Sequence, residues 1–316
     1  MLKSDHMKCL VTGGAGFIGS QIQDKLVELG FEVAVIDDLS TGKKDYLNSK
    51  ARLYEIDVTD KEAVKKAIEE IAPNYVFHLA AQVAVPYSMS HPEEDLRINI
   101  LGMLNLLEAV KDLGIKKFVY SNTGGAFYGD VDQSLLPINE DCVVKKPTSF
   151  YGVSKQCAET YLKLFGNIYH LPWVSLRYSN VYGPRQEGNK EAGVVAIFTT
   201  KLLKGEQPTI NGDGSHTRDY VFVEDVVEAN IKAMDYEDSD YFNIATGIET
   251  KNQQVFDVLE SILATGITPN YGPARKGDAY RVVLSPQKAN QKLGWKAATD
   301  FKEGVRKTIE YYKNSR

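Results

Sequence analysis

The chain has 316 residues and a formal net charge of −5 at pH 7, with 25% charged and 43% hydrophobic residues. These proportions are those of an ordinary globular protein and exclude a disordered or a collagen-like chain. The mildly acidic balance gives no electrostatic reason to expect a nucleic acid or an anionic membrane as partner, so an anionic ligand would have to be held by local groups.

The N-terminal residues and the cysteines bear on processing and compartment. Residues 1–6 lack the apolar core of a signal peptide, and we expect them to be an artificial leader before a natural start at Met7. Cys9, Cys142 and Cys157 form no CxxC pair and no metal-ligand spacing, which favours free thiols in a reducing cytoplasm and no metal site. No run approaches about 18 apolar residues, so we expect no membrane span.

The first half of the chain alternates short apolar runs with amphipathic stretches. Strands are predicted over 8–12, 32–36, 52–56, 75–79, 117–121 and 173–177, each apolar enough for burial on both faces. Helices are predicted over 60–71, with Asp60 as N-cap, and over 92–113, ending at Gly114. This alternation predicts an α/β fold with a Rossmann-type, doubly wound parallel sheet.

A glycine-rich segment follows the first predicted strand and opens a helix. Gly13, Gly16 and Gly19 are spaced to allow a tight turn, close approach of a diphosphate and packing of the helix on the sheet. The N–H groups and partial positive charge of the helix N-terminus, at Phe17 and Ile18, would then bind the diphosphate. This context predicts a dinucleotide-binding loop.

Asp37, at the end of the second predicted strand, bears on which dinucleotide is bound. A carboxylate there accepts hydrogen bonds from the adenosine ribose and disfavours a 2′-phosphate, which favours NAD over NADP. Lys43 and Lys44 are cations that could accept that phosphate, although a solvated turn is the simpler reading of them.

Three polar side chains form a candidate catalytic group. Tyr151 and Lys155 are spaced i, i+4 and share one helix face. A nearby ammonium, helped by cationic NAD⁺, is expected to lower the pKa of Tyr151 and make it a general base. Thr123, with Ser121 as the alternative, closes the fifth strand at the sheet edge where ligands bind, and we expect it to orient the reacting hydroxyl.

The second half of the chain is less regular and richer in Gly and Pro. Helices are expected near 192–204, 224–234, 252–263 and 300–312, and short strands near 209–211, 219–223 and 241–244. We therefore expect an NAD-binding domain over 1–180 and a smaller α+β substrate domain over 181–316, with segments near 219–247 returning to the first domain.

Further motifs in the same order resemble the extended short-chain dehydrogenase/reductase family, in its NAD-dependent nucleotide-sugar epimerase/dehydratase branch. The match extends over nearly the whole chain and looks closest to the UDP-glucose 4-epimerases. The segments that carry it are Asp57-Val58, His78-Leu79-Ala80-Ala81, Asn99 within Ile98-Asn99-Ile100, Asn180-Val181-Tyr182-Gly183-Pro184-Arg185, Gly212-Asp213-Gly214, Arg218-Asp219-Tyr220, and Arg275-Lys276-Gly277-Asp278.

The resemblance implies a role for individual residues. Tyr151 would be the base, Lys155 its partner and a ligand of the nicotinamide ribose, and Thr123 would orient the sugar 4-hydroxyl. The UDP would be held by Asn180, Arg218, Tyr220, Arg275 and Asp278, with the arginines on the diphosphate. NAD would contact Gly13, Gly16, Phe17, Ile18, Gly19, Asp37, Asp38, Asp57, Val58, Leu79, Ala80, Ala81, Asn99, Ser121 and Tyr178, together with Tyr151 and Lys155.

The chemistry so implied is 4-epimerisation of a UDP-hexose (UDP-glucose and UDP-galactose) by transient oxidation to a 4-keto sugar and return of the hydride. Thr123 is followed by Gly124-Gly125-Ala126, which lack the acid of the related dehydratases and decarboxylases. A UDP-N-acetylglucosamine or UDP-glucuronate 4-epimerase, or another NAD(P)-dependent nucleotide-sugar oxidoreductase or dehydratase, remains the alternative. Val282 is small enough to admit an N-acetyl group.

Two further alternatives concern the class and the assembly. A relative without catalysis that only binds dinucleotide is disfavoured by the intact Tyr151, Lys155 and Thr123, and a reductase that consumes NADPH is also possible in this family. The resemblance suggests a homodimer formed through the helices predicted over 92–113 and 151–170. Leu101, Leu104, Leu106 and Leu107 offer apolar surface for it, unless they line the sheet.

Overall fold

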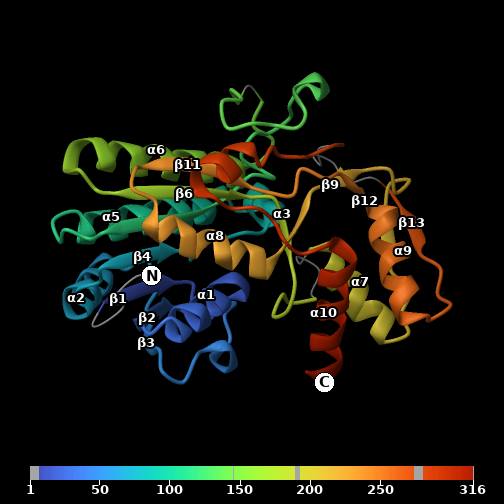
Figure 1. Cartoon of the computed structure of the whole chain (residues 1–316), viewed down its shortest axis with the longest axis horizontal. Helices are drawn as coiled ribbons and strands as arrows, with labels where there is room; N and C mark the ends of the chain where they lie inside the picture. The colour runs from blue at the N-terminus through green and yellow to red at the C-terminus, as the bar shows by residue number, and fades with distance from the viewer. Residues whose placement is uncertain (1–6, 145, 189–192, 274–279, 316) are drawn as a thin grey trace.

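The computed structural model describes residues 7–144, 146–188, 193–273 and 280–315. A seven-stranded sheet runs through its larger part, in the order β11-β6-β5-β4-β1-β2-β3 (Figure 1). Its strands are β1 (Lys8–Thr12), β2 (Glu32–Asp37), β3 (Arg52–Glu55), β4 (Tyr75–His78), β5 (Lys117–Thr123), β6 (Trp173–Tyr178) and β11 (Asp240–Ile244). Every neighbouring pair is parallel, which confirms the predicted doubly wound fold.

The six strands predicted in the first half all lie in this sheet, and their ends differ from the prediction by at most two residues. The order of the strands reverses between β1 and β4, which are neighbours with Thr12 opposite His78. In open α/β sheets the crevice outside the carboxyl ends of the strands at such a reversal is where ligands bind. The fold therefore points to this edge for the site.

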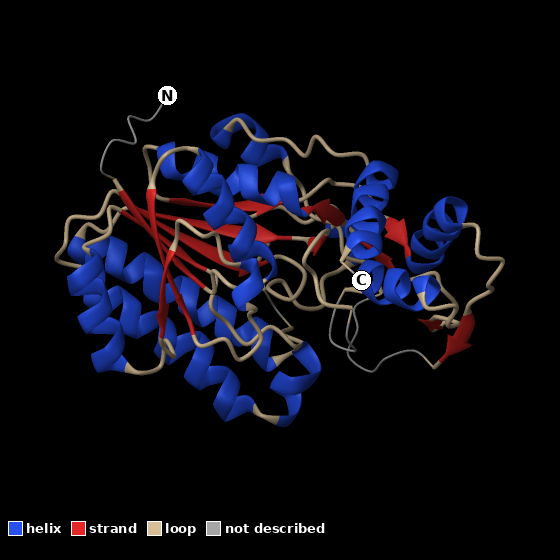
Figure 2. Cartoon of the chain, turned by 90° about the horizontal axis from the view of Figure 1, so that it is seen from below, coloured by secondary structure: helices blue, strands red, loops and turns tan. Residues whose placement is uncertain are grey.

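Helices cover both faces of the sheet (Figure 2). On one face α1 (Phe17–Glu28) and α8 (Val223–Asp235) pack in one apolar cluster with β1, β5 and β6. On the other face α2 (Lys61–Ile71), α5 (Gly102–Val110) and α6 (Phe150–Tyr169) share a second cluster, which contains Val64, Leu106 and Leu162. These helices bury the periodic apolar residues that predicted them.

The helix predicted over 92–113 is not a single regular helix. It is divided into α4 (Pro92–Leu96), a π-helical turn over Arg97–Leu101, and α5, and it ends before Gly114. A π-turn inserts one extra residue in the helical register and is common at functional sites. It lies where Asn99 is buried, so the deviation falls at a residue of the candidate site. The short helix α3 (Val85–Ser90) before it was not predicted.

The remaining elements form a smaller lobe at one end of the sheet (Figure 1). It contains α7 (Val194–Leu203), α9 (Asn252–Leu263), α10 (Phe301–Asn314) and the strand pairs β13 (Asn270–Gly272) with β8 (Thr209–Asn211) and β12 (Thr250–Lys251) with β9 (Thr217–Arg218). At its junction with the sheet β7 (Asn180–Tyr182) pairs with β10 (Tyr220–Phe222). The strand predicted over 219–223 is confirmed as β10, and the separate strand β9 precedes it, with Asp219 between the two. The proposed division into domains stays a prediction.

Some features of the described residues concern the environment of the chain. Cys9, Cys142 and Cys157 are all free thiols. No helix within the described ranges is long and apolar enough to cross a membrane. No group of three or more His, Cys, Asp or Glu side chains in the same ranges is placed to hold a metal ion. The proposed leader, residues 1–6, lies outside the described residues.

Candidate active site

The glycine-rich loop has the close contacts that a dinucleotide-binding turn needs. Gly13 has φ +69°, and a Cβ there would lie 2.7 Å from the backbone nitrogen of Ala80. A Cβ on Gly19 would collide with the carbonyl oxygen of Gly13. Helix α1 starts at Phe17 with no side-chain cap and no acidic residue in its first turn. This end of α1 therefore suits the diphosphate of NAD.

Asp37 closes β2 beside this loop. It is buried, and its carboxylate accepts hydrogen bonds at 2.9 Å from the backbone N–H groups of Ala15 and Leu39. Burial raises the pKa of Asp37, and the two N–H groups oppose that rise. Asp38 is exposed and accepts hydrogen bonds from Ser40. Asp37 is thus anchored to the glycine loop, and the two together would form part of an NAD site.

The two lysines after Asp37 are each matched by a carboxylate. The Nζ of Lys43 lies 2.6 Å from Glu187, and the Nζ of Lys44 lies 3.0 Å from Glu55. Both cations have a nearby counter-charge, which weakens the argument for a 2′-phosphate at this edge. The structure thus supports the choice of NAD that Asp37 suggested.

The segment after β4 is fixed against β1 by one hydroxyl. The Oγ1 of Thr12 accepts hydrogen bonds at 3.2 Å from the N–H groups of Leu79 and Ala80, and it lies 2.7 Å from the Nδ1 of His78. Burial lowers the pKa of His78 to about 3, so this imidazole is neutral. Residues 79–81, with Ala81 at the end, therefore start at the sheet edge beside the glycine loop.

Three further predicted NAD contacts lie after β3 (Asp57 and Val58) and just before α5 (Asn99). Asp57 accepts a hydrogen bond at 2.8 Å from the N–H of Thr59 and pairs with Arg97 at 3.3 Å. Val58 is buried against Gly102, where a Cβ would come within 2.7 Å of the valine side chain. Asn99 is also buried, and its Oδ1 accepts a hydrogen bond at 2.9 Å from the N–H of Gln82.

The three predicted catalytic residues come together at the carboxyl end of β5. Ser149 caps α6 by accepting a hydrogen bond at 3.0 Å from the N–H of Gly152, which places Tyr151 in the first turn. Thr123 is the last residue of β5 and donates a hydrogen bond that favours the phenolate of Tyr151. One turn along α6, the Nζ of Lys155 donates a hydrogen bond at 2.8 Å to the carbonyl of Ser121.

The expected lowering of the Tyr151 pKa is wrong for this structure. Burial raises the pKa of Tyr151 above its ordinary value, and the hydrogen bond from Thr123 opposes the rise only in part. Burial also lowers the pKa of Lys155 to about 7. The pKa of Tyr151 is not lowered as expected because the ammonium of Lys155 is directed to the carbonyl of Ser121 and to the ring of Tyr120, 4.5 Å from the ring centroid. Burial is therefore the largest influence on the protonation of both groups.

The side chains of Ser121 and Tyr178 form a hydrogen bond next to the three catalytic residues. The Oγ of Ser121 and the hydroxyl of Tyr178 lie 2.8 Å apart, and Asn230 of α8 donates a hydrogen bond to the same hydroxyl at 2.8 Å. Tyr178 is buried. Its hydroxyl is therefore committed to fixing the end of β5, and a contact with NAD would involve its ring.

The predicted substrate-binding residues lie in different surroundings, and two of them lie outside the described residues. Asn180 starts β7, and its Oδ1 lies 3.7 Å from where a Cβ on Gly125 would be, so it faces the turn after Thr123. Arg218, on β9, donates a hydrogen bond at 2.8 Å to the carbonyl of Thr217. Tyr220 is buried in the core of the smaller lobe, and its role at the substrate stays a prediction. Arg275 and Asp278 lie outside the described residues.

Sequence reasoning missed Asp219, which is fully buried between β9 and β10. Its carboxylate accepts hydrogen bonds from the N–H and hydroxyl of Thr246, at 2.9 and 2.7 Å, and from the N–H of Gly247 at 2.9 Å. It thereby connects the segment after β11 to the strands that carry Asn180 and Arg218. The signal was present, because Asp219 stands within the motif Arg218-Asp219-Tyr220, but the motif gave it no role.

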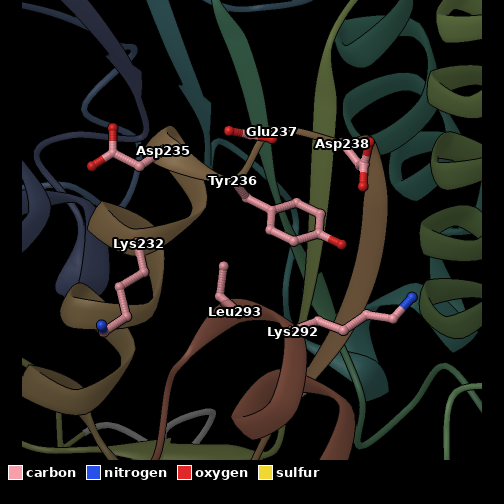
Figure 3. A pocket seen from close by; sticks show the side chains of 7 residues that line it. All are labelled: Lys232, Asp235, Tyr236, Glu237, Asp238, Lys292 and Leu293. Carbon is pink, nitrogen blue, oxygen red and sulfur yellow. The ribbon is translucent and has the colours of Figure 1, made fainter.

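A surface hollow of about 430 Å³ lies away from this site. Lys232, Asp235, Tyr236, Glu237, Asp238, Lys292 and Leu293 line it, and charges of both signs surround the ring of Tyr236 (Figure 3). Residues 232–238 of this lining directly precede β11 in the chain, so the hollow lies at the amino end of that strand. It belongs to the other edge of the sheet from the glycine loop and Tyr151.

Comparisons with known proteins agree with the geometry of the site. The model of the NAD dependent epimerase/dehydratase family matches residues 9–245. The UDP-glucose 4-epimerase of Thermotoga maritima, solved with UDP-glucose, has 46% identity and a TM-score of 0.96, over 98% of this chain and 99% of that one. The UDP-glucose 4-epimerase of Thermus thermophilus in complex with NAD has 42% identity and a TM-score of 0.91, over 98% and 100%.

A third similar structure is that of an epimerase named for a different substrate. It is a UDP-N-acetylglucosamine 4-epimerase from Methanobrevibacter ruminantium, with 33% identity and a TM-score of 0.92, over 98% of this chain and 99% of that one. The similarity thus extends over the full length of chains that act on more than one UDP-sugar.

Proposed function

The chain belongs to the NAD dependent epimerase/dehydratase family, and from this membership we propose that it is an isomerase with bound NAD that interconverts UDP-glucose and UDP-galactose at carbon 4 of the sugar. The main observation behind the proposal is that Thr123, Tyr151 and Lys155 lie together at one edge of the sheet. The glycine loop lies at the same edge. The full-length similarity to two UDP-glucose 4-epimerases supports the same substrate.

In the proposed reaction the side chains bind the sugar and move one proton. Thr123 hydrogen-bonds the 4-hydroxyl and directs it to Tyr151, which takes its proton and later returns it. Lys155 orients the nicotinamide ribose and stabilises the charge on Tyr151. NAD, when bound, supplies the oxidation of the sugar carbon and its reduction from the opposite face. The 4-keto sugar must turn between these two steps within the site.

The remaining proposed contacts hold the two ligands. The loop from Gly13 to Gly19, Asp37, Asp57, residues 79–81 and Asn99 would bind NAD. Asn180 and Arg218 would bind the UDP, and Arg275 and Asp278 are proposed to complete that site. A diphosphate in a chain of net negative charge needs such forked cationic donors.

The turn after Thr123 favours simple epimerisation over dehydration. A Cβ on Gly124 would collide with the side chain of Leu284 and lie 3.1 Å from the carbonyl oxygen of Tyr178. An acidic side chain at this position would therefore displace the side chain of Leu284 and crowd that carbonyl. Without an acid there, the site lacks the additional proton transfer that elimination of water requires.

The proposal is tested by incubating the purified protein with UDP-glucose, UDP-galactose, UDP-N-acetylglucosamine and UDP-glucuronate, each separately, and separating the products. We expect UDP-glucose and UDP-galactose to reach the same mixture from either side, with no net consumption of NAD. Conversion of none of the four sugars, loss of water from the sugar, or oxidation of NADPH without a sugar nucleotide would each contradict the proposal.

UDP-N-acetylglucosamine is the second candidate substrate. Val282 is buried, and its N–H donates a hydrogen bond at 3.3 Å to the carbonyl of Thr217, next to Arg218. A side chain of this size leaves more room than a larger one for an N-acetyl group. Conversion of the acetylated sugar at a kcat/KM equal to or above that of UDP-glucose would favour this candidate.

We also propose a cytoplasmic homodimer. Helix α6 exposes apolar side chains in two groups with a spacing of three or four residues, with exposed fractions of 46% for Phe150 and 43% for Val153, and of 48% for Leu164 and 57% for Ile168. Of the leucines suggested earlier, Leu106 and Leu107 are fully buried and line the sheet, whereas Leu101 is exposed. Light scattering should give twice the chain mass, and charged substitutions at Leu164 and Ile168 should give the monomer.

A further inference from the structure

Asp95 is a buried carboxylate at the candidate site to which the reaction described above gives no task. It lies on α4 and is 1% exposed. Its Oδ1 accepts hydrogen bonds from the Nε2 of Gln82 at 2.8 Å and from the Nδ2 of Asn99 at 3.1 Å. A carboxylate is removed from water in this way only at a considerable cost, so its surroundings need an explanation.

The contacts of Asp95 lead to the catalytic helix. The Nδ2 of Asn99 also lies 3.1 Å from the Oγ of Ser154, which in turn donates a hydrogen bond at 3.0 Å to the carbonyl of Tyr151. Gln82 completes the connection, because its N–H donates to the Oδ1 of Asn99 and its carbonyl accepts from the Nδ2. Asp95 thus holds together the segment that follows residues 79–81 and the first turn of α6.

Asp95 on α4 and Lys155 on the neighbouring helix α6 are both buried, and each acts on the protonation of the other, while burial raises the pKa of Asp95. Lys155 is 4% exposed, and its Nζ contacts the carbonyl of Ser121 and the ring of Tyr120, neither of which carries a negative charge. The titratable groups that face Asp95 are Lys155 and Tyr151 from α6 and Tyr120 from β5. On the same segment Arg97 pairs with Glu94 and Asp57, at 2.8 and 3.3 Å. Asp95 is therefore the buried carboxylate whose charge acts on the catalytic lysine.

We propose that Asp95 is a positioning residue of this active site: it supplies the counter-charge that keeps Lys155 protonated, and through Gln82 and Asn99 it fixes the loop after β4 against the helix that carries Tyr151. The proposal deepens the function given above and rests on it. A negative charge at Asp95 favours the protonated form of both Lys155 and Tyr151. Its removal should therefore lower the pKa of both groups.

The test is Asp95→Asn, which keeps the size of the side chain and removes its charge, compared with Asp225→Asn. Asp225 is a buried carboxylate of α8 that accepts hydrogen bonds at 3.1 Å from the N–H groups of Ala298 and Thr299, away from the site. We expect both limbs of the kcat/KM profile against pH to move down by about one unit in Asp95→Asn. In Asp225→Asn the profile should stay in place even if the melting temperature falls.

A second readout does not depend on turnover. In protein labelled with 13C at the lysine ε carbons, the resonance of Lys155, assigned by its loss in Lys155→Met, should titrate at lower pH in Asp95→Asn than in the wild type. An unchanged titration of Lys155 in a folded variant would overturn the proposal. Asp95→Glu, which restores the charge, should return the titration toward that of the wild type, and its failure to do so would also count against the proposal.

These two readouts separate the failure of the inference from the failure of the function. A wild-type protein that converts no UDP-sugar would contradict the proposed activity, while the lysine titration would still decide the role of Asp95. A wild-type protein that is an epimerase, and whose pH profile and lysine resonance are unaffected by Asp95→Asn, would leave the activity in place and refute the positioning role.

Discussion

Helix α6 carries two buried charges one turn apart, and the structure surrounds them in different ways. Glu159 is 1% exposed and is met by Arg177, at 2.9 and 2.6 Å, and by Lys163 at 2.7 Å. Two neutral groups, the amide of Asn122 and the hydroxyl of Ser175, also donate to it at 2.9 Å. Lys155 is 4% exposed and donates to one carbonyl, that of Ser121.

The difference has a consequence for protonation. Burial acts to raise the pKa of Glu159, but the hydrogen bonds and charges of Arg177 and Lys163 outweigh it and lower that pKa. Burial lowers the pKa of Lys155 to about 7, with Asp95 opposing. A charge that is fully paired keeps one protonation state and supports the fold. A charge that is only partly paired can have a pKa close to the working pH, which is what a proton-transfer site needs.

The paired charge also joins several elements. Arg177 lies on β6 and donates a hydrogen bond at 2.8 Å to the hydroxyl of Tyr128, which donates to Asn243 of β11 at 2.7 Å. Asn243 donates in turn to the carbonyl of Ile138 at 3.0 Å. The network therefore connects α6, two sheet strands and the loop after β5, all of which carry or support Thr123 and Tyr151.

The largest expected effect comes from Tyr151→Phe, which removes the proton acceptor and leaves the paired charge intact. Activity should fall by about 10²- to 10⁴-fold, since this is the usual contribution of a general acid or base. The bound NAD and the melting temperature should stay near those of the wild type, because the ring that fills the site is kept. Turnover is measured with UDP-galactose and NAD content by absorbance after denaturation. Full activity in this variant would remove Tyr151 from the reaction.

The converse change is Glu159→Gln, which should act on the fold first. It leaves the guanidinium of Arg177 buried without its counter-charge, and breaking a buried pair in this way costs about 3–5 kcal/mol. Urea unfolding should show this loss. The matched control is Glu224→Gln, which breaks an exposed pair with Lys307 (2.7 Å) and should cost at most about 1 kcal/mol. Equal losses in the two variants would contradict the distinction between the paired charge and a surface pair.

Much of the fold and the backbone of the candidate site could be predicted because these features depend on neighbouring residues. A parallel strand is marked by its own apolar run, and the glycine loop by spacings within seven residues, from Gly13 to Gly19. Tyr151 and Lys155 are recognisable for the same reason, as two residues one turn apart. Each of these signals can be read from one short window of the sequence.

The features that sequence reasoning missed depend on contacts between distant segments. Asp219 meets Thr246 across 27 residues, and Glu159 meets Arg177 across 18. The side chain of Tyr220 packs in the core of the smaller lobe, an environment that no local pattern indicates. The pKa of Tyr151 was predicted in the wrong direction because helical spacing shows that Lys155 is near and does not show that both groups are desolvated.

The last prediction concerns Lys155 itself and separates the two charges by pH. Its folded pKa is about 7, and a lysine in an unfolded chain has a pKa of about 10.4. Between these values the unfolded state binds more protons than the folded state, so the free energy of unfolding should rise with pH, by up to about 1.4 kcal/mol per pH unit. This stability is complete above the unfolded pKa and is lost as the pH falls toward 7. Urea unfolding at several values between pH 7 and 10 should show the rise in the wild type and a smaller one in Lys155→Met; parallel curves for the two proteins would mean that Lys155 is as readily charged in the folded chain as in water.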